Sequence, residues 1–161
     1  MNTPQQNSTT KCPSDALRDV GEHTFESLAF MFTMPQEEEP TTTVRVSFSG
    51  PSCGGALYLT VSSAMLAQLA VNMMGIADGV EPTAAQQVDA LKEIGNVICG
   101  NVLPVIAGAQ AEFSIAAPEA LAPQDSRPPL PSEEPLARAR LKLDGGSAEL
   151  KLYMDASPEK G

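Results

Sequence analysis

The sequence predicts an α+β fold whose elements follow the order helix, strand, strand, helix, helix, strand, strand, strand. Apolar residues recur at helical spacing in three segments, residues 14–34, 62–74 and 82–107. Paired segments rich in β-branched or alternating apolar residues flank glycine-containing turns, within residues 42–61 and 136–155. A further short strand is expected at residues 112–116.

The first helix is expected to begin at Ser14, because a serine hydroxyl can cap the first turn. Asp15 suits the positive end of the helix dipole, and Pro35 cannot continue the helix and should end it. Two strands follow, at residues 42–49 and 56–61. The connection between them, residues 50–55, has the glycine, proline and serine content of a long turn.

The second helix can be capped by Ser62 or Ser63 and should stop at Gly75. The third helix is the longest; it places Pro82 in its first turn and runs to about residue 107. Residues 117–135 contain six prolines and are expected to form a loop. The chain then closes on a hairpin of residues 136–144 and 147–155 around the turn sequence Asp144-Gly145-Gly146.

These elements fit one domain, residues 14–155, which is long enough to bury a sizeable core. Residues 1–13 are rich in Asn, Gln, Thr and Pro and are expected to form a disordered tail, and residues 156–161 a short C-terminal tail. The net charge of −10 argues against nucleic acid or an anionic membrane as a partner, because like charges repel.

The three cysteines, Cys12, Cys53 and Cys99, are too few and too far apart for a disulfide framework or a CxxC metal site. They suggest the reducing cytoplasm. The N-terminal residues lack the basic start and apolar stretch of a secretory signal. The most apolar segment, residues 64–76, is shorter than the roughly 20 residues that span a bilayer. We therefore expect a cytoplasmic protein with no membrane partner.

The long third helix separates an apolar face from a small polar one. At about 100° per residue, its apolar positions share one broad arc that should face the core. These positions are Val88, Leu91, Ile94, Gly95, Ile98, Val102, Val105 and Ile106. Asp89, Glu93, Asn96 and Gly100 fall on the opposite side, with Glu93 and Asn96 one turn apart. A solvated helix face would look the same, so the pattern alone does not assign a function.

The residues around this polar side have low helix propensity and lower the stability of the helix. Gly95 and Gly100 each cost roughly 1 kcal/mol against alanine, and Asn96 and Asn101 up to ~0.7 kcal/mol each. Local rules that are broken without a visible structural gain tend to mark functional sites. Gly100 also removes a side chain that would keep a partner at a distance.

Residues 89–101, DALKEIGNVICGN, resemble the signature helix of the CheC/CheX chemotaxis phosphatases, Glu-x-x-Asn followed by Gly-Asn. The similarity in element order extends over about residues 14–155. It implies one sheet packed by long helices. The first helix has Phe25 where a second signature would have asparagine, so the resemblance is to the single-site, CheX-like branch, whose members typically pair through their sheets as homodimers.

The resemblance implies a phosphatase that hydrolyses the aspartyl phosphate of a CheY-like response regulator. Asn96 would position the attacking water, and Glu93 would anchor a lysine of the regulator. Asp89, which is otherwise an exposed structural acid, and Gly100 would contribute to binding the partner. The Mg²⁺ would be supplied by the regulator, so no metal ligand or bound cofactor is expected in this chain.

An adaptor or flagellar-switch-like module that binds a response regulator without catalysis remains the alternative. Other active sites are less well supported by the sequence. His23 has no serine or cysteine paired with it by a recognisable motif, which argues against a nucleophilic triad. The helical angle of Cys99 directs its thiol toward the apolar side of the third helix, where a buried structural cysteine is expected.

Overall fold

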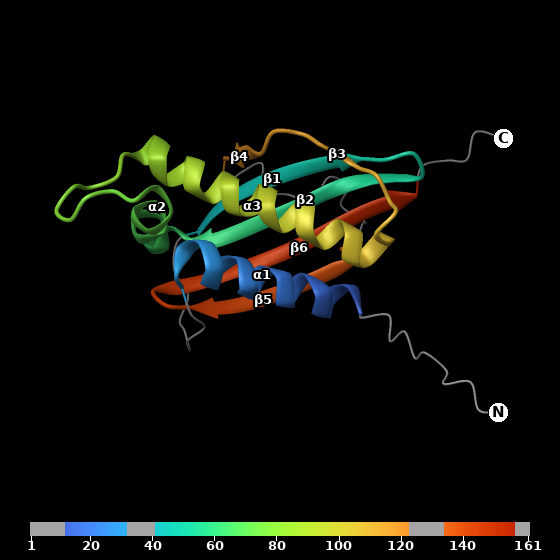
Figure 1. The fold of residues 1–161 in the computed structure, drawn as a ribbon, viewed down its shortest axis with the longest axis horizontal. Coiled ribbons are helices and arrows are strands. Elements are labelled where there is room, and N and C mark those ends of the chain that lie inside the picture. The colour runs from blue at the N-terminus through green and yellow to red at the C-terminus, as the bar shows by residue number, and fades with distance from the viewer. Residues whose placement is uncertain (1–11, 32–40, 123–133, 157–161) are drawn as a thin grey trace, which may run out of the picture.

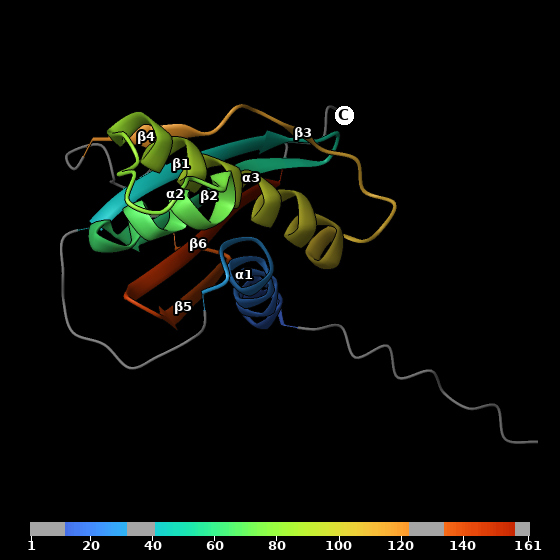
Figure 2. The ribbon, with the colours of Figure 1, turned by 60° about the vertical axis from the view of Figure 1, so that its left-hand side comes forward.

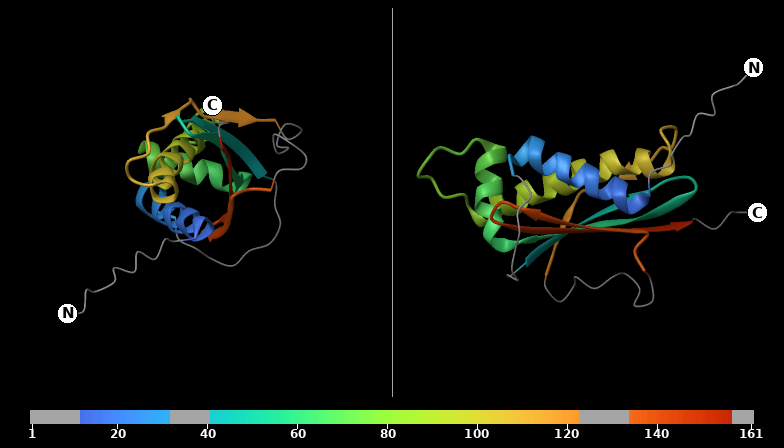
Figure 3. Two further views of the ribbon diagram at one scale, coloured as in Figure 1. Left: turned by 90° about the vertical axis from the view of Figure 1, so that its right-hand side faces the viewer. Right: turned by 90° about the horizontal axis from the view of Figure 1, so that it is seen from below.

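A six-stranded antiparallel sheet carries the fold, and helices pack on one of its faces (Figures 1 and 3). The computed structural model describes residues 12–31, 41–122 and 134–156. The elements in chain order are α1 (Pro13–Ala29), β1 (Thr41–Ser49), β2 (Cys53–Ser62), the 3-10 turn η1 (Ser63–Met65), α2 (Leu66–Met74), α3 (Ala84–Ala107), β3 (Ser114–Ile115), β4 (Glu119–Leu121), β5 (Ala137–Leu143) and β6 (Gly146–Ala156). The prediction of an α+β fold with one sheet packed by helices is confirmed.

The strands lie in the order β3-β1-β2-β6-β5, and β4 also pairs with β1. Strand β4 is one strand more than the sequence predicted, and it lies in the proline-rich segment that was expected to be a loop. Its register sets Glu119 opposite Arg45 and Leu121 opposite Thr43. Pairing with β1, far away in the sequence, forms this strand, and local propensity does not reveal such a contact.

Helices α1 and α3 lie side by side across the inner face of the sheet, while α2 packs against both (Figure 2). The apolar core fills the space between helices and sheet. Its fully buried side chains include Leu17 and Phe25 of α1, Leu91 and Ile94 of α3, and Leu57 of β2. By the usual ~25 cal/mol per Å² of buried apolar surface, each such side chain contributes about 2 kcal/mol.

Several local predictions were wrong in detail. Neither Ser62 nor Ser63 caps α2, which begins at Leu66; Oγ of Ser62 accepts the backbone N–H of Ser147 at 2.9 Å. The hydroxyl of Ser14 does not cap α1, which begins at Pro13; it accepts the backbone N–H of Arg138 at 3.2 Å. Gly54 and Gly55 are not in the first hairpin turn but in β2. Pro82 precedes the cap of α3 and is not in its first turn. Tertiary contacts outweigh the local signal at Ser14, where a strand 124 residues away takes the hydroxyl.

The ends of several predicted segments lie outside the described residues. These are most of the tail 1–13, the last residues of the C-terminal tail and part of the proline-rich connection. The prediction that the first helix continues to Pro35 was wrong: α1 ends at Ala29, and Phe30 follows it in the left-handed conformation. Gly75 ends α2 in the same conformation, as predicted.

By length and apolar composition, α3 is the one described helix that would suit a membrane span. A helix in the core of a globular domain meets the same criteria. The apolar side chains Leu91, Ile94 and Ile98 are fully buried against the rest of the fold. The apolarity of α3 is therefore accounted for by its packing on the sheet, although Val105, which was assigned to the apolar arc, is exposed.

Gly95 lets α3 approach the sheet closely. A Cβ at this position would lie 3.2 Å from Cγ2 of Val46 and 3.3 Å from Cγ2 of Val44, both buried side chains of β1. The interpretation of Gly95 as part of a functional signal is thus corrected: the glycine serves the contact between helix and sheet. Gly100 differs, since the nearest atom to a Cβ there would be Cδ1 of Ile115 at 3.8 Å, an ordinary contact.

Alanine at these two glycines should have opposite effects on stability. Gly100→Ala should raise the free energy of unfolding by up to ~1 kcal/mol through helix propensity. Gly95→Ala has the same gain but must overpack two stiff β-branched side chains at a cost of 1–3 kcal/mol, so we expect a net loss of about 1 kcal/mol. Urea unfolding of both variants measures the difference. Equal stabilisation by both would show that α3 does not need Gly95 to reach β1.

Candidate functional site

The start of α3 is fixed by a capping box, which sets the position of every residue along the helix. The backbone N–H of Gln86 donates to Oγ1 of Thr83 at 3.1 Å, and the backbone N–H of Thr83 donates to Oε1 of Gln86 at 2.9 Å. Two otherwise unpaired donors of the first turn are satisfied in this way. The helix then continues without interruption through residue 107.

Four residues define the polar stripe of α3: Asp89, Glu93, Asn96 and Gly100. The structure places Asp89, Glu93 and Gly100 at the exposed surface, and Asn96 is half-buried. They lie on the side of α3 opposite the buried residues of the helix, and Glu93 and Asn96 are neighbours one turn apart. The sequence prediction and the structure therefore bring the same four residues together.

The functional groups of the stripe have no hydrogen bond or ion pair with any other residue in the described part of the chain. This holds for the Glu93 carboxylate and for the Asn96 amide. A structural asparagine in a helix usually bonds a neighbouring backbone group or faces open solvent, and Asn96 is half-buried without such a bond. Both groups are therefore available to another molecule.

Pro104 changes the backbone at the end of the stripe. Proline has no N–H, so residue 104 cannot donate the helical hydrogen bond to the carbonyl of Gly100, four residues earlier. The stripe thus includes a backbone acceptor in addition to its side chains. The spacing of four residues between Gly100 and Pro104 is a signal in the sequence for this free carbonyl.

The stripe can position a polar ligand but lacks the groups of a self-contained catalytic centre. The Asn96 amide can donate and accept hydrogen bonds without charge, and Glu93 can accept a charge-assisted bond. Among the described residues, no group of three or more His, Cys, Asp and Glu side chains is placed to hold a metal ion. The arrangement is suited to docking onto a partner that brings the reactive group.

Two other reactive side chains near the helices are accounted for structurally. Cys99 is fully buried in the core, and desolvation raises the pKa of its thiol to about 12. His23 is exposed on α1, where its Nε2 lies 3.4 Å from Oγ of Ser27. All three cysteines are free, as expected from the sequence.

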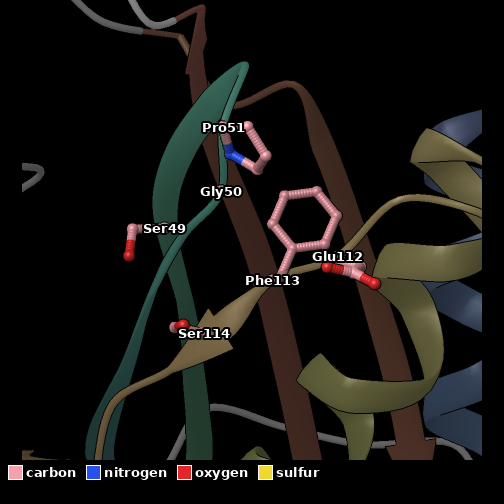
Figure 4. Close-up of a pocket in the computed structure, with 6 residues that line it drawn as sticks. All are labelled: Ser49, Gly50, Pro51, Glu112, Phe113 and Ser114. Atoms are coloured by element: carbon pink, nitrogen blue, oxygen red, sulfur yellow. The ribbon is translucent and has the colours of Figure 1, made fainter.

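A shallow depression lies between the β1–β2 turn and the segment that follows α3 (Figure 4). It has a volume of about 620 Å³ and is lined by Ser49, Gly50, Pro51, Glu112, Phe113 and Ser114. The ring of Phe113 packs edge-to-face on Phe48 with centroids 5.7 Å apart, which fixes one wall. None of the four stripe residues lines this depression.

Comparison with known protein families gives a match over residues 42–137, to a family described as Chemotaxis phosphatase CheX. The match covers more than half of the chain and includes all of α3. A search of curated proteins finds no significant match.

Solved structures show the same fold at low sequence identity. The chemotaxis protein CheX from Vibrio vulnificus superimposes with a TM-score of 0.67 at 14% identity, over 91% of this chain and 98% of the other. A putative chemotaxis protein from Desulfovibrio vulgaris Hildenborough gives 0.66 at 12% identity, over 89% and 96%. A CheX-CheY-BeF3-Mg²⁺ complex from Borrelia burgdorferi gives 0.54 at 14% identity, over 87% and 96%.

The burial of Cys99 can be tested through thiol chemistry. At pH 8 we expect an aromatic disulfide reagent to label exposed Cys12 readily. Cys99 should react on the order of 1,000-fold more slowly than a free thiol, because only the thiolate attacks and its population is suppressed. Peptide mapping by mass spectrometry identifies the labelled residue, with the urea-unfolded protein as control. Equal labelling of Cys12 and Cys99 in the folded protein would show that the apolar face of α3 is open to solvent.

Proposed function

The chain belongs to the CheX family of chemotaxis phosphatases, and from this premise we propose that it hydrolyses the aspartyl phosphate of a CheY-like response regulator. One observation carries the proposal: Glu93 and Asn96 lie side by side on α3 without partners in the described structure. The relative from Borrelia burgdorferi, solved in complex with CheY, BeF3 and Mg²⁺, supports a receiver domain as the partner.

Asn96 is the residue we assign to the attacking water. Hydrolysis of an acyl phosphate needs a water in line with the scissile bond, and positioning supplies most of the catalysis in such reactions. The amide can hold that water by donating one hydrogen bond and accepting another. It is also uncharged, so it does not repel the phosphoryl group as a carboxylate would. Its half-buried position limits the side-chain rotamers and keeps the amide in place.

Glu93 fixes the orientation of the partner. Its exposed carboxylate can accept a charge-assisted hydrogen bond from a lysine of the receiver domain. Because Glu93 and Asn96 are one turn apart on the same helix, a bond at Glu93 determines where the amide of Asn96 meets the phosphoryl group. Asp89, one turn earlier, extends this acidic contact toward the start of the helix.

Gly100 completes the docking surface. It exposes the helix backbone at the surface beside Asn96, and Cδ1 of Ile115 would lie 3.8 Å from a Cβ at this position. The Gly100 carbonyl, which Pro104 leaves without its helical donor, can accept a hydrogen bond from the partner. With no side chain at Gly100, a receiver domain can approach the helix backbone closely at this point.

The partner supplies what the stripe lacks. In this proposal the receiver domain brings both the phosphoryl group and the Mg²⁺ held by its own acidic residues, and this chain binds no cofactor. We place the reaction in the cytoplasm, where response regulators act. Homodimerisation through the sheet remains an expectation from family resemblance.

Asn96→Ala should separate catalysis from binding. We expect dephosphorylation of the CheY-like receiver domain of the same cell to slow about 100-fold, a cost of ~2.7 kcal/mol in the barrier, with binding almost unchanged. The decay of the phosphorylated receiver, charged with acetyl phosphate, measures the rate, and titration with the beryllofluoride-activated receiver measures the affinity.

Gln110→Ala is the control, because it removes a side-chain amide at an exposed position just after α3, outside the signature and the stripe. It should retain the wild-type rate. A wild-type rate for Asn96→Ala, with binding intact, would instead support a regulator-binding adaptor or flagellar-switch-like module.

Glu93→Gln should weaken docking. Removing the charge while keeping the shape is expected to raise KM about 10-fold, or ~1.4 kcal/mol, with a smaller effect on kcat. The difference from wild type should shrink at high salt, since salt screens an exposed charge pair. Glu26→Gln, an equal charge change at an exposed position of α1, is the control. A fall in kcat with KM unchanged would place Glu93 in the chemical step and not in docking.

A further inference from the structure

The outer face of the sheet, opposite the helices, carries a concentration of positive charge. Alternation in β5 buries Ala137, Ala139, Leu141 and Leu143 against the core, and exposes Arg138, Arg140 and Lys142 on the other face of the sheet. Lys151 of β6 lies on the same face, because it is opposite Arg138 in the ladder. We call these four residues the basic strip: Arg138, Arg140, Lys142 and Lys151.

The basic strip opposes the charge balance of the chain. Four of the ten Lys and Arg residues lie on two neighbouring strands, in a chain with twenty Asp and Glu and a net charge of −10. Two acids lie on the outer face of β5 and β6, Glu149 and Asp155, both on β6. Glu149 accepts from Nε of Arg140 at 2.6 Å and from Nζ of Lys151 at 3.0 Å. Two positive charges remain in excess of negative ones on these two strands.

The strip costs stability in the isolated protein. Arg138 and Lys151 are directly opposite each other in the antiparallel pair, and like charges in that arrangement are destabilising. Neither Arg138 nor Lys142 has an ion pair with another described residue. Burial by itself would raise the pKa of Glu149, but hydrogen bonds from Lys151 and Arg140 outweigh it and lower the pKa. The carboxylate of Glu149 is thus already paired with these two residues and does not balance the charge of Arg138 or Lys142. Like charges that face each other across two strands, without a visible gain in stability, indicate a functional surface.

The spacing of the strip suits an extended acidic segment. Alternate residues of a strand are about 6.6 Å apart, so the three exposed cations of β5 repeat at the period of one side of an extended peptide. Carboxylates on alternate residues of such a peptide can meet them in register.

Two other occupants fit less well. Single-stranded nucleic acid binds on exposed aromatic rings that stack on its bases, and the tyrosines of this face, Tyr58 and Tyr153, are buried and packed edge-to-face on each other, so they offer no such platform. A second copy packed face to face on this surface would bring two basic strips toward each other, so the homodimer expected from the family resemblance is better accommodated at the edge of the sheet, where β5 lies.

We propose that the basic strip is a docking surface for an extended acidic segment of a partner protein. The surface lies across the sheet from the polar stripe of α3, so it can be occupied while a receiver domain is docked on the helices. The proposal does not depend on the phosphatase activity.

The test uses a fluorescein-labelled peptide of four Glu alternating with four Ser, titrated with the full chain at low salt and followed by anisotropy. The double variant Arg138→Gln, Lys142→Gln should weaken binding about 10-fold. The double variant Arg18→Gln, Lys92→Gln removes the same charge on the helical side and should bind nearly as wild type. The strip variant should also keep the wild-type rate of receiver dephosphorylation and should not unfold at lower urea concentration.

Three results would overturn the proposal. If both double variants lower the affinity for the peptide equally, the peptide responds only to the net charge of the chain and not to the basic strip. Tighter binding of a labelled ten-nucleotide thymidine strand, lost in the strip variant, would identify the surface as a nucleic-acid site. Conversion of a dimer to a monomer by the strip variant, seen in sedimentation velocity, would identify it as a contact between copies.

Discussion

The close packing of α3 on β1 is the contact on which the candidate site depends. Gly95 allows the helix to lie against Val44 and Val46, and the buried residues on either side hold it there. Since consecutive residues differ by about 100°, a helix fixed at Gly95 must turn Glu93 and Asn96 away from the sheet. The pairing of a neutral amide with a carboxylate at the surface is thus a consequence of core packing, and a roll of the helix would bury one of them.

The stripe was predictable from sequence because helical geometry alone determines which residues share a face. The same is true of the hairpin β5–β6, whose alternation and Asp-Gly-Gly turn are local signals. What could not be predicted depends on distant contacts. Ser14 caps no helix because β5 takes its hydroxyl, and β4 forms only because β1 offers it an edge. Gly95 looked like a costly residue of a functional site because the valines that require it are some fifty residues earlier.

The sheet separates two surfaces of opposite character. The helical side presents Asp89 and Glu93 around Asn96, and the outer side presents the basic strip of β5 and β6. Because the two surfaces carry opposite charge, they favour different partners, and each partner is disfavoured on the opposite surface. A receiver domain on α3 and an acidic segment on the strip would not compete for space. The two proposals together would have the fold bring a response regulator to a second protein.

The measurement that tests the central claim most directly is the NMR signal of the Asn96 side-chain amide during titration with a beryllofluoride-activated receiver domain. We predict a large shift of this signal, accompanied by shifts along α3 near Glu93 and Gly100, and none at β5. An unchanged Asn96 signal, with the shifts concentrated on the outer face of the sheet, would contradict the account.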